Sequence, residues 1–317
     1  MFIDVVLLIL GFALLIKGAD MFVDGSSSTA RNLKVPSLII GLTIVAFGTS
    51  APELAVSFKS IMAKSGDLVI GNVIGSNIAN ILLIVGIASL LCPLKVKNDT
   101  VKKELPITIL MSLLLVTLFV DNVFDSGDIN IISRSDGFVI LLFFTIFVYY
   151  LFSIIKKKKD SNNSEKPKFG MLKSIIYIII GLASIIIGSN LVVNNAIKIA
   201  EILNVSERVI SFTVLAIGTS LPELVTAITS ARKGEQDLLI GNVIGSNIFN
   251  IGIVLALPVA IFGSISGLGF SYLDLGMLVL SSLVLFIFAR NDKVISKGEG
   301  IAMLILFVVY YAYIIFA

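Results

Sequence analysis

The sequence contains no histidine, no tryptophan and a single cysteine, Cys92, among its 317 residues. One cysteine cannot form an internal disulfide, and a chain without imidazole or clustered thiol groups has no ligand set for zinc or iron. The sequence also lacks a glycine-rich phosphate loop and a matched pair of nucleophile and base. These absences argue against an enzyme and against a bound cofactor.

Charged residues are also scarce, at 14% of the chain, whereas hydrophobic residues make up 57%. This composition is far more apolar than that of a soluble domain of similar length. Apolar runs of about 20 residues, each long enough to cross a bilayer as a helix, recur from end to end. Because the runs are continuously apolar, we predict helices and not a β-barrel. The predicted all-α integral membrane fold has ten spans, at 2–24, 36–63, 67–92, 104–121, 137–155, 171–195, 206–232, 237–262, 272–290 and 297–316.

The distribution of lysine and arginine predicts the orientation in the membrane. With the N-terminus outside, the inner loops carry 18 of the 24 basic residues and the outer loops carry five, with Lys17 inside the first span. Short cytoplasmic loops carry such an excess of positive charge. We therefore expect a multi-pass protein of the cell membrane with both termini extracellular. The stretch 156–170 is predicted to be a basic cytoplasmic linker.

The chain repeats itself at an offset of 170 residues. DLVIGNVIGSNIAN at 67–80 matches DLLIGNVIGSNIFN at 237–250 with two differences, and TIVAFGTSAPE at 43–53 matches TVLAIGTSLPE at 213–223. Each copy holds five predicted spans, an odd number, so the second copy must enter the membrane in the opposite orientation. Inverted repeats of this kind are typical of secondary transporters. We predict two inverted five-helix repeats, 1–155 and 171–317, whose duplicated stretches lie at about 36–92 and 206–262.

Each half places a carboxylate inside an apolar span, Glu53 after Pro52 and Glu223 after Pro222. A proline inside a helix breaks or kinks it and frees carbonyl groups. A charge far from the membrane surface costs roughly 2.5–3.5 kcal/mol on insertion scales unless it is paired, protonated or bound to a metal. The sequence offers no lysine or arginine at matching depth. We therefore predict that both glutamates bind a cation.

Hydroxyl and amide oxygens recur at helical spacing near these carboxylates. Thr49 precedes Glu53 by four residues and Thr219 precedes Glu223 by four, which puts hydroxyl and carboxylate on one helix face. Ca²⁺ takes about six to eight oxygen ligands, so this inventory suits Ca²⁺ better than Mg²⁺ or a transition metal. A second polar stripe, also at steps of four, contains Asn72, Ser76 and Asn80 and their counterparts Asn242, Ser246 and Asn250.

The paired GTS-x-PE and GN-x-x-GSN-x-x-N segments resemble the α-repeats of the cation/calcium exchanger superfamily, and nearly the whole chain resembles the compact prokaryotic sodium/calcium exchanger type. The resemblance implies an antiporter that exchanges Na⁺ for Ca²⁺ by alternating access, with the first and sixth spans sliding as a gate. Glu53 and Glu223 would be the central ligands, with Thr49 and Thr219 beside them. The resemblance further implies Na⁺ sites completed by the carbonyl groups of Ala46 and Ala216 with Ser76 and Ser246, a centre lined by Asn80 and Asn250, weaker candidates at Ser50 and Ser220, and structural roles for Asn77 and Asn247.

Residue 250 is Asn, where potassium-dependent exchangers of this superfamily carry Asp. With two carboxylates in the site, one Ca²⁺ or two Na⁺ would neutralise it, and a third Na⁺ would carry net charge across the membrane. We therefore predict that exchange is electrogenic and does not require K⁺.

Two other functions remain open from the sequence. An H⁺/Ca²⁺ antiporter would use the same fold, although the GNA-x-E segments of that branch are absent. A cation channel would use the same ligands, although an inverted duplication fits alternation better than a continuous pore. In each case the expected partners are the transported ions, Ca²⁺ and Na⁺ in the favoured reading, and membrane lipid. Neither a nucleic acid nor an obligate protein partner is expected.

Overall fold

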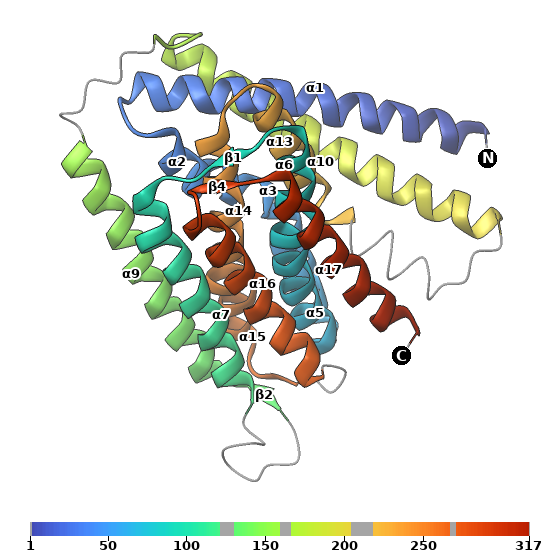
Figure 1. Cartoon of the computed structure of the whole chain (residues 1–317). Coiled ribbons are helices and arrows are strands. Elements are labelled where there is room, and N and C mark those ends of the chain that lie inside the picture. Colours follow the sequence, from blue (N-terminus) through green and yellow to red (C-terminus); the bar gives the residue numbers. More distant parts are fainter. Residues whose placement is uncertain (1, 121–129, 159–165, 204–217, 267–270, 317) are drawn as a thin grey trace.

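The computed structural model describes residues 2–120, 130–158, 166–203, 218–266 and 271–316, and nearly all of these are helical. Figure 1 shows the arrangement and labels most of the α-helices and strands. In the text, η denotes π-helical segments that continue these helices. The first half contains α1 (Phe2–Asn32), α2 (Ser37–Ile40), η1 (Gly41–Val45), α3 (Ala46–Thr49), α4 (Ala51–Met62), α5 (Gly66–Ile78), η2 (Ala79–Val85), α6 (Gly86–Leu91), β1 (Leu94–Lys95), η3 (Thr100–Glu104), α7 (Leu105–Phe119), β2 (Ile131–Ile132) and α9 (Arg134–Lys158). The second half contains α10 (Met171–Ile202), α13 (Leu221–Arg232), α14 (Gln236–Phe249), η5 (Asn250–Leu255), α15 (Ala256–Phe262), β3 (Ile265–Ser266), α16 (Tyr272–Arg290), β4 (Val294–Ile295) and α17 (Lys297–Phe316).

The described helices are those of an integral membrane protein, as the sequence predicts. Seven are long and apolar enough to cross a bilayer, and the bent pair 37–49 and 51–62 would make an eighth span. By length and hydropathy, the described residues therefore give up to eight candidate spans, compared with the ten predicted from the sequence. The span predicted at 206–232 lies partly outside the described residues, and the one at 104–121 corresponds to α7, which has 15 residues.

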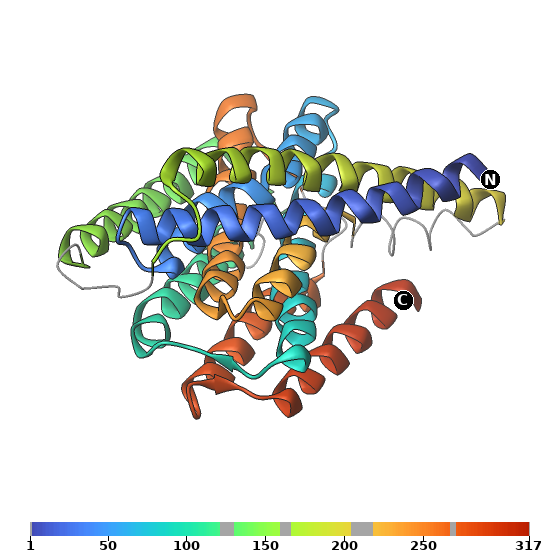
Figure 2. The same ribbon diagram turned by 90° about the horizontal axis from the view of Figure 1, so that it is seen from above.

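Helices α1 and α10 lie side by side and run in opposite directions across the rest of the molecule (Figures 1 and 2). Glycines let their backbones approach closely. A Cβ atom added to Gly18 would lie 2.8 Å from the carbonyl oxygen of Gly181, and one added to Gly11 would lie 3.0 Å from that of Gly188. Small residues permit such contacts between membrane helices. Gly11 and Gly18 match Gly181 and Gly188 at the 170-residue offset, so this antiparallel pairing relates equivalent helices of the two repeats.

Both α1 and α10 extend beyond their predicted ends at residues 24 and 195. In α1 the extra turns contain Ser26, Ser27, Ser28 and Thr29, whose polarity ends the apolar run in the sequence although all four are buried. The Thr29 hydroxyl donates to the carbonyl oxygen of Gly25 at 2.8 Å. Such bonds satisfy small polar groups inside a helix, so the helix continues where hydropathy falls.

Two short antiparallel ladders join the halves at opposite ends of the bundle. β1 pairs with β4 through Leu94 opposite Ile295, and β2 pairs with β3 through Ile132 opposite Ile265. β1 and β4 lie at one end and β2 at the other (Figure 1). Strands were not predicted, because two-residue ladders leave no alternating pattern in a sequence.

The duplicated segments form the centre of the fold. In the apolar windows of 66–91 and 236–262, 78% of residues are buried, compared with 17% in that of 134–156 on α9. Equivalent residues meet along this centre: the Ser112 hydroxyl on α7 lies 3.2 Å from the Ser282 hydroxyl on α16, and the two positions differ by 170. The polar groups that recur in both halves of the sequence therefore lie in the core.

Candidate functional site

The two buried glutamates occupy the first turns of helices that start at a break. α3 ends at Thr49 and α4 begins at Ala51, with a bend of 44° between the two helical segments. Pro52 lies in the first turn of α4, where its missing N–H group is tolerated. α13 begins in the same way with Leu221 and Pro222. The predicted break in the helix at Pro52 is therefore confirmed, and it places a carboxylate at a helix N-terminus, which favours negative charge.

Both carboxylates are withdrawn from solvent. Glu53 and Glu223 are each 1% exposed. The Ser50 hydroxyl donates to Glu223 Oε1 at 3.2 Å, so a residue of the first repeat holds the carboxylate of the second. Within the described residues, neither oxygen of Glu53 accepts a hydrogen bond, nor does Glu223 Oε2.

Further bonds between the repeats position the surrounding oxygens. The Thr49 hydroxyl donates to Asn242 Oδ1 at 3.2 Å, and Asn250 Nδ2 donates to the Ser76 hydroxyl at 3.0 Å. α4, which carries Glu53, packs against η5, which starts at Asn250. The site is therefore built from both repeats rather than being contained in one.

A symmetric network of four asparagines lies between α5–η2 and α14–η5. Asn77 Nδ2 donates to the carbonyl oxygen of Asn247, and Asn247 Nδ2 donates to that of Asn77, both at 3.3 Å. Asn80 Nδ2 donates to Asn247 Oδ1, and Asn250 Nδ2 donates to Asn77 Oδ1, both at 3.1 Å. Because the amide nitrogens are used in this way, Asn80 Oδ1 and Asn250 Oδ1 are left without a donor in the described part of the chain.

Around the two glutamates, these bonds leave five buried carboxylate and amide oxygens with no partner among the described residues: both of Glu53, Oε2 of Glu223, and Oδ1 of Asn80 and Asn250. A buried polar atom without a partner is costly, and proteins retain few of them. A hard cation would satisfy all five, since it accepts oxygen ligands of this kind. No cluster of three or more carboxylate, thiol or imidazole side chains occurs in the described residues, so the neutral oxygens would be needed to complete the coordination.

The other predicted site residues are placed as follows. The Ala46 carbonyl oxygen accepts from the Ser50 N–H group at 3.0 Å and from the Thr49 hydroxyl at 3.5 Å. Ser76 and Ser246 are buried on the stripe, and the Ser246 hydroxyl donates to Asn242 Oδ1 at 3.5 Å. Ser220 is buried just before α13, Thr219 beside it is half-buried, and Ala216 lies outside the described residues.

Two parts of the arrangement were missed by the sequence analysis. Asn242 was placed on the stripe but not among the ligands, although it accepts from both Thr49 and Ser246. Asn72 Nδ2 donates to the Glu53 carbonyl oxygen at 2.9 Å and to the Ser57 hydroxyl at 3.1 Å, so it fixes α4 onto α5. Both asparagines belong to the repeating pattern, but a pattern does not identify a partner on another helix.

Comparisons with known proteins agree with this geometry. The family model described as sodium/calcium exchanger protein matches residues 3–153 and 173–316. The chain is 36% identical to the putative antiporter CaxA of Alkalimonas amylolytica, covering all of both chains, and 34% identical to the sodium/calcium exchanger MaX1 of Methanosarcina acetivorans, covering 97% of each. Its fold matches that of the sodium-calcium exchanger NCX_Mj soaked with 10 mM Na⁺ and without Ca²⁺, with a TM-score of 0.84, 34% identity and 98% of each chain covered. With the family model matching almost the full length, this chain belongs to the sodium/calcium exchanger family.

Proposed function

We propose that this protein is a secondary antiporter that exchanges Na⁺ for Ca²⁺ across the cell membrane by alternating access. The observation that carries the proposal is the group of buried oxygens on Glu53, Glu223, Asn80 and Asn250 that have no partner in the described part of the chain. The two carboxylates supply the charge that one Ca²⁺ or two Na⁺ would neutralise. Na⁺ and Ca²⁺ would therefore compete for overlapping positions, with Thr49, Ser76 and Ser246 and the Ala46 carbonyl group among the further ligands.

An inverted pair of five-helix repeats would supply the two alternating states. Its support is the antiparallel packing of equivalent glycines on α1 and α10 and the reciprocal bonds between Asn77 and Asn247. In such repeats the binding groups lie near the midplane and one unit moves against another. The α1–α10 pair lies across the core (Figure 2), where its displacement would open one side of the site while closing the other.

Transport assays in proteoliposomes would test the exchange directly. The proteoliposomes are loaded with labelled Ca²⁺, and a Na⁺ gradient or an H⁺ gradient is then imposed separately at a fixed membrane potential. Exchange predicts Ca²⁺ flux with a Na⁺ gradient and none with an H⁺ gradient alone. Flux driven by H⁺ would instead assign a proton-coupled antiporter, and Ca²⁺ flux without any counter-ion would indicate a channel.

We predict that the exchange does not require K⁺. Asn250 and its counterpart Asn80 supply oxygen without charge, so no third carboxylate is available in these stripes for a further large monovalent ion. Sodium-driven Ca²⁺ flux should be the same with choline or K⁺ as the balancing cation, measured at clamped potential. A severalfold stimulation by K⁺ would contradict the prediction, whereas a flux that changes with potential alone would support net charge movement.

The proposed orientation places the linker, the β1–β4 ladder and the loop after α13 in the cytoplasm. Contacts between these segments support a shared side of the membrane. Arg31 forms an ion pair with Glu235 at 2.8 Å, Lys168 forms one with Asp24 at 2.7 Å, and the N–H group of Lys95 in β1 donates to Gln236 Oε1 at 3.0 Å. In a chain with Cys92 replaced by serine, a cysteine introduced at Asn162 should react with an impermeant maleimide only when the reagent reaches the cytoplasmic side. Labelling of intact cells from outside would reverse the assigned orientation and place both termini in the cytoplasm.

A further inference from the structure

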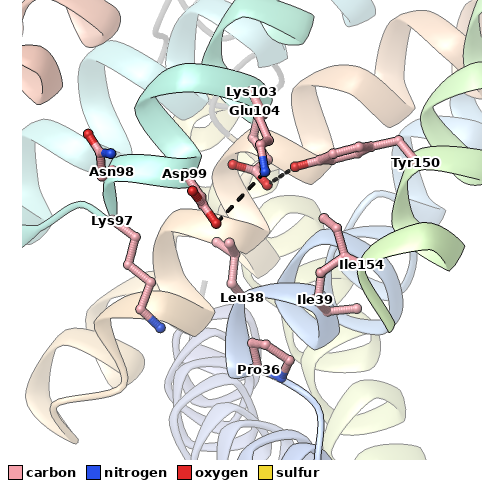
Figure 3. Close-up of a pocket in the computed structure, with 10 residues that line it drawn as sticks. All are labelled: Pro36, Leu38, Ile39, Lys97, Asn98, Asp99, Lys103, Glu104, Tyr150 and Ile154. Carbon is pink, nitrogen blue, oxygen red and sulfur yellow. Dashed lines mark hydrogen bonds and ion pairs between the residues drawn. The ribbon is translucent and has the colours of Figure 1, made fainter. Parts of the chain in front are cut away.

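A cavity of about 280 Å³ with several charged residues in its wall, called the polar cavity below, lies between α2, η3 and α9 (Figure 3). Its wall includes the charged residues Lys97, Asp99, Lys103 and Glu104 together with Tyr150 and Ile154. Lys97, Asp99 and Lys103 have side chains about half exposed, as expected at the level of lipid headgroups. The cavity therefore joins the membrane surface to the interior of the bundle.

Glu104 is the buried group of this cavity, with 1% of its surface exposed. Its Oε1 accepts the hydroxyl of Tyr150, as drawn in Figure 3. Its Oε2 has no hydrogen-bond partner within the described residues, and neither has the buried hydroxyl of Thr100 one turn earlier. A buried carboxylate oxygen without a donor is costly, so the cavity presents an acceptor for a donor from outside the chain.

Comparison with the second repeat shows that the tyrosine bond engages only one of the two carboxylate oxygens at this position. The residue equivalent to Glu104 is Asp274, which lies at the 170-residue offset and accepts a hydrogen bond from the hydroxyl of Tyr310 at 2.8 Å. There the remaining oxygen accepts from the N–H and hydroxyl groups of Ser271, both at 2.8 Å, and caps α16. In the first repeat, η3 continues the helix upstream of Glu104, so no helix end needs capping. The tyrosine bond is shared by both repeats, whereas the free oxygen belongs to Glu104 alone.

The charges around the cavity select the kind of ligand. Lys97 forms an ion pair with Asp237, and Lys103 Nζ lies 3.8 Å from Asp99 Oδ2. Each ammonium group has three donors, so both lysines retain donors for an anionic group. A metal ion would face two ammonium groups here, and a simple anion would face two carboxylates. A zwitterion with an ammonium group toward Glu104 and a phosphate toward the lysines places each of its charges beside groups of the opposite sign.

A second, apolar groove of about 360 Å³ lies between η1–α3 and α9, and it is lined by Leu42, Phe47, Val148, Leu151 and Phe249 among others. Two residues of the polar cavity lie on the same helical segments as the groove: Ile39 on α2, which η1 continues, and Ile154 on α9. The cavity and the groove therefore follow one seam between these segments. Phe47 is 55% exposed and Phe152, which also lines the groove, is 63% exposed, which opens the groove to the hydrocarbon of the bilayer. An acyl chain fits these surroundings.

We propose that this seam binds a phospholipid with a primary ammonium headgroup, of the phosphatidylethanolamine class. The ammonium group donates to Glu104 Oε2, the phosphate lies against Lys97 and Lys103, and an acyl chain follows η1 toward the edge-to-face contact of Phe47 and Phe249, whose ring centroids are 5.1 Å apart. Phe47 adjoins Ala46 and Phe249 adjoins Asn250, so the bound lipid contacts both helices of the cation site at their lipid-facing side.

Native mass spectrometry of the detergent-purified protein tests this binding without any ion gradient, so its outcome is independent of transport. The probes are dioleoyl phosphatidylethanolamine, its trimethylated counterpart phosphatidylcholine, and phosphatidylglycerol. We expect phosphatidylethanolamine to be retained about tenfold more than either, as one additional charge-assisted hydrogen bond would give. Glu104→Gln should reduce retention to the phosphatidylcholine level, whereas the matched control Asp274→Asn should keep the preference. Val148 lines the apolar groove, so Val148→Trp, which fills the groove, should lower retention of all three lipids.

Equal retention of the three lipids by the wild-type chain would overturn the proposal, as would an unchanged preference in Glu104→Gln. Preferential binding of phosphatidylglycerol would do the same, because it would assign the site to anionic lipid. If Glu104→Gln does not fold, the wild-type protein with mono- and dimethylated phosphatidylethanolamine decides the question, since each methyl group removes one donor. Retention should then fall stepwise, and a flat series contradicts the role of Glu104.

Discussion

Glu53→Gln and Glu223→Gln should each reduce Na⁺-driven Ca²⁺ uptake by at least about 100-fold, because each removes half of the negative charge of a buried site. At the effective dielectric of a protein, two unit charges 4 Å apart interact by about 4 kcal/mol, and every 1.4 kcal/mol corresponds to a factor of ten. Gln keeps the size of the side chain and one oxygen, so the loss reports charge rather than packing. Uptake into proteoliposomes, normalised to inserted protein, measures it.

A second readout separates binding from transport. If Ca²⁺ binds the proposed site, it should raise the thermal unfolding temperature of the folded wild-type protein in detergent. In both variants this rise should disappear, while the unfolding temperature without ions stays at or above that of the wild type, because two acidic groups no longer share one buried site. Glu299→Gln, which removes an acidic charge at the N-terminus of α17, is the matched control and should transport as the wild type does. If either glutamate variant takes up Ca²⁺ at the wild-type rate, the replaced carboxylate is not a ligand of the transported ion.

Much of the site could be predicted from the sequence because the duplication marks it. Glu53 and Glu223 stand out as charges inside apolar spans, and the burial of both at 1% exposure agrees with that reading. The break at Pro52 follows from the chemistry of proline and is present as the 44° bend between α3 and α4. Local rules therefore sufficed wherever one residue or one helix determined the outcome.

Contacts between the repeats could not be predicted in the same way. A step of four residues puts Asn242 and Ser246 on one helix face, but it does not say that Thr49 donates to Asn242 from another helix. Nor could the sequence distinguish Glu104 from Asp274, which are aligned acids at the starts of equivalent helices. Their difference depends on whether the preceding residues are helical, since only a helix that begins there needs a cap.

The four-asparagine network should control how the central amide oxygens point, and this assigns Asn77 and Asn247 more than the structural role that the family resemblance implies. Asn77 accepts from Asn250 and donates to the backbone of Asn247, and Asn247 does the same with Asn80 and Asn77. Truncating Asn247 removes the bond that holds the Asn80 amide, whereas truncating Asn77 leaves the Asn250 amide with its bond to the Ser76 hydroxyl.

Asn77→Ala and Asn247→Ala should therefore each lower Ca²⁺ uptake by roughly tenfold or more and destabilise the fold by about 1–3 kcal/mol, the usual cost of leaving buried polar groups unpaired. Because Asn250 keeps its bond to the Ser76 hydroxyl after Asn77→Ala, Asn247→Ala should have the larger effect on uptake. Uptake in proteoliposomes and thermal unfolding in detergent, each with and without Ca²⁺, measure the two effects separately.

Ser112→Ala is the matched control for the asparagine variants, because Ser112 also meets its repeat equivalent, Ser282, in the core. The Ser282 hydroxyl keeps a bond to the Leu278 carbonyl oxygen at 3.3 Å after the change, so little should be lost in stability or in transport. If Ser112→Ala impairs uptake as much as Asn77→Ala does, the effect belongs to packing between the repeats and not to the ligands. If Asn77→Ala instead loses stability but transports normally, the amide oxygens of Asn80 and Asn250 need no orienting partner, and the ion would have to be held by the carboxylates and hydroxyl groups without them.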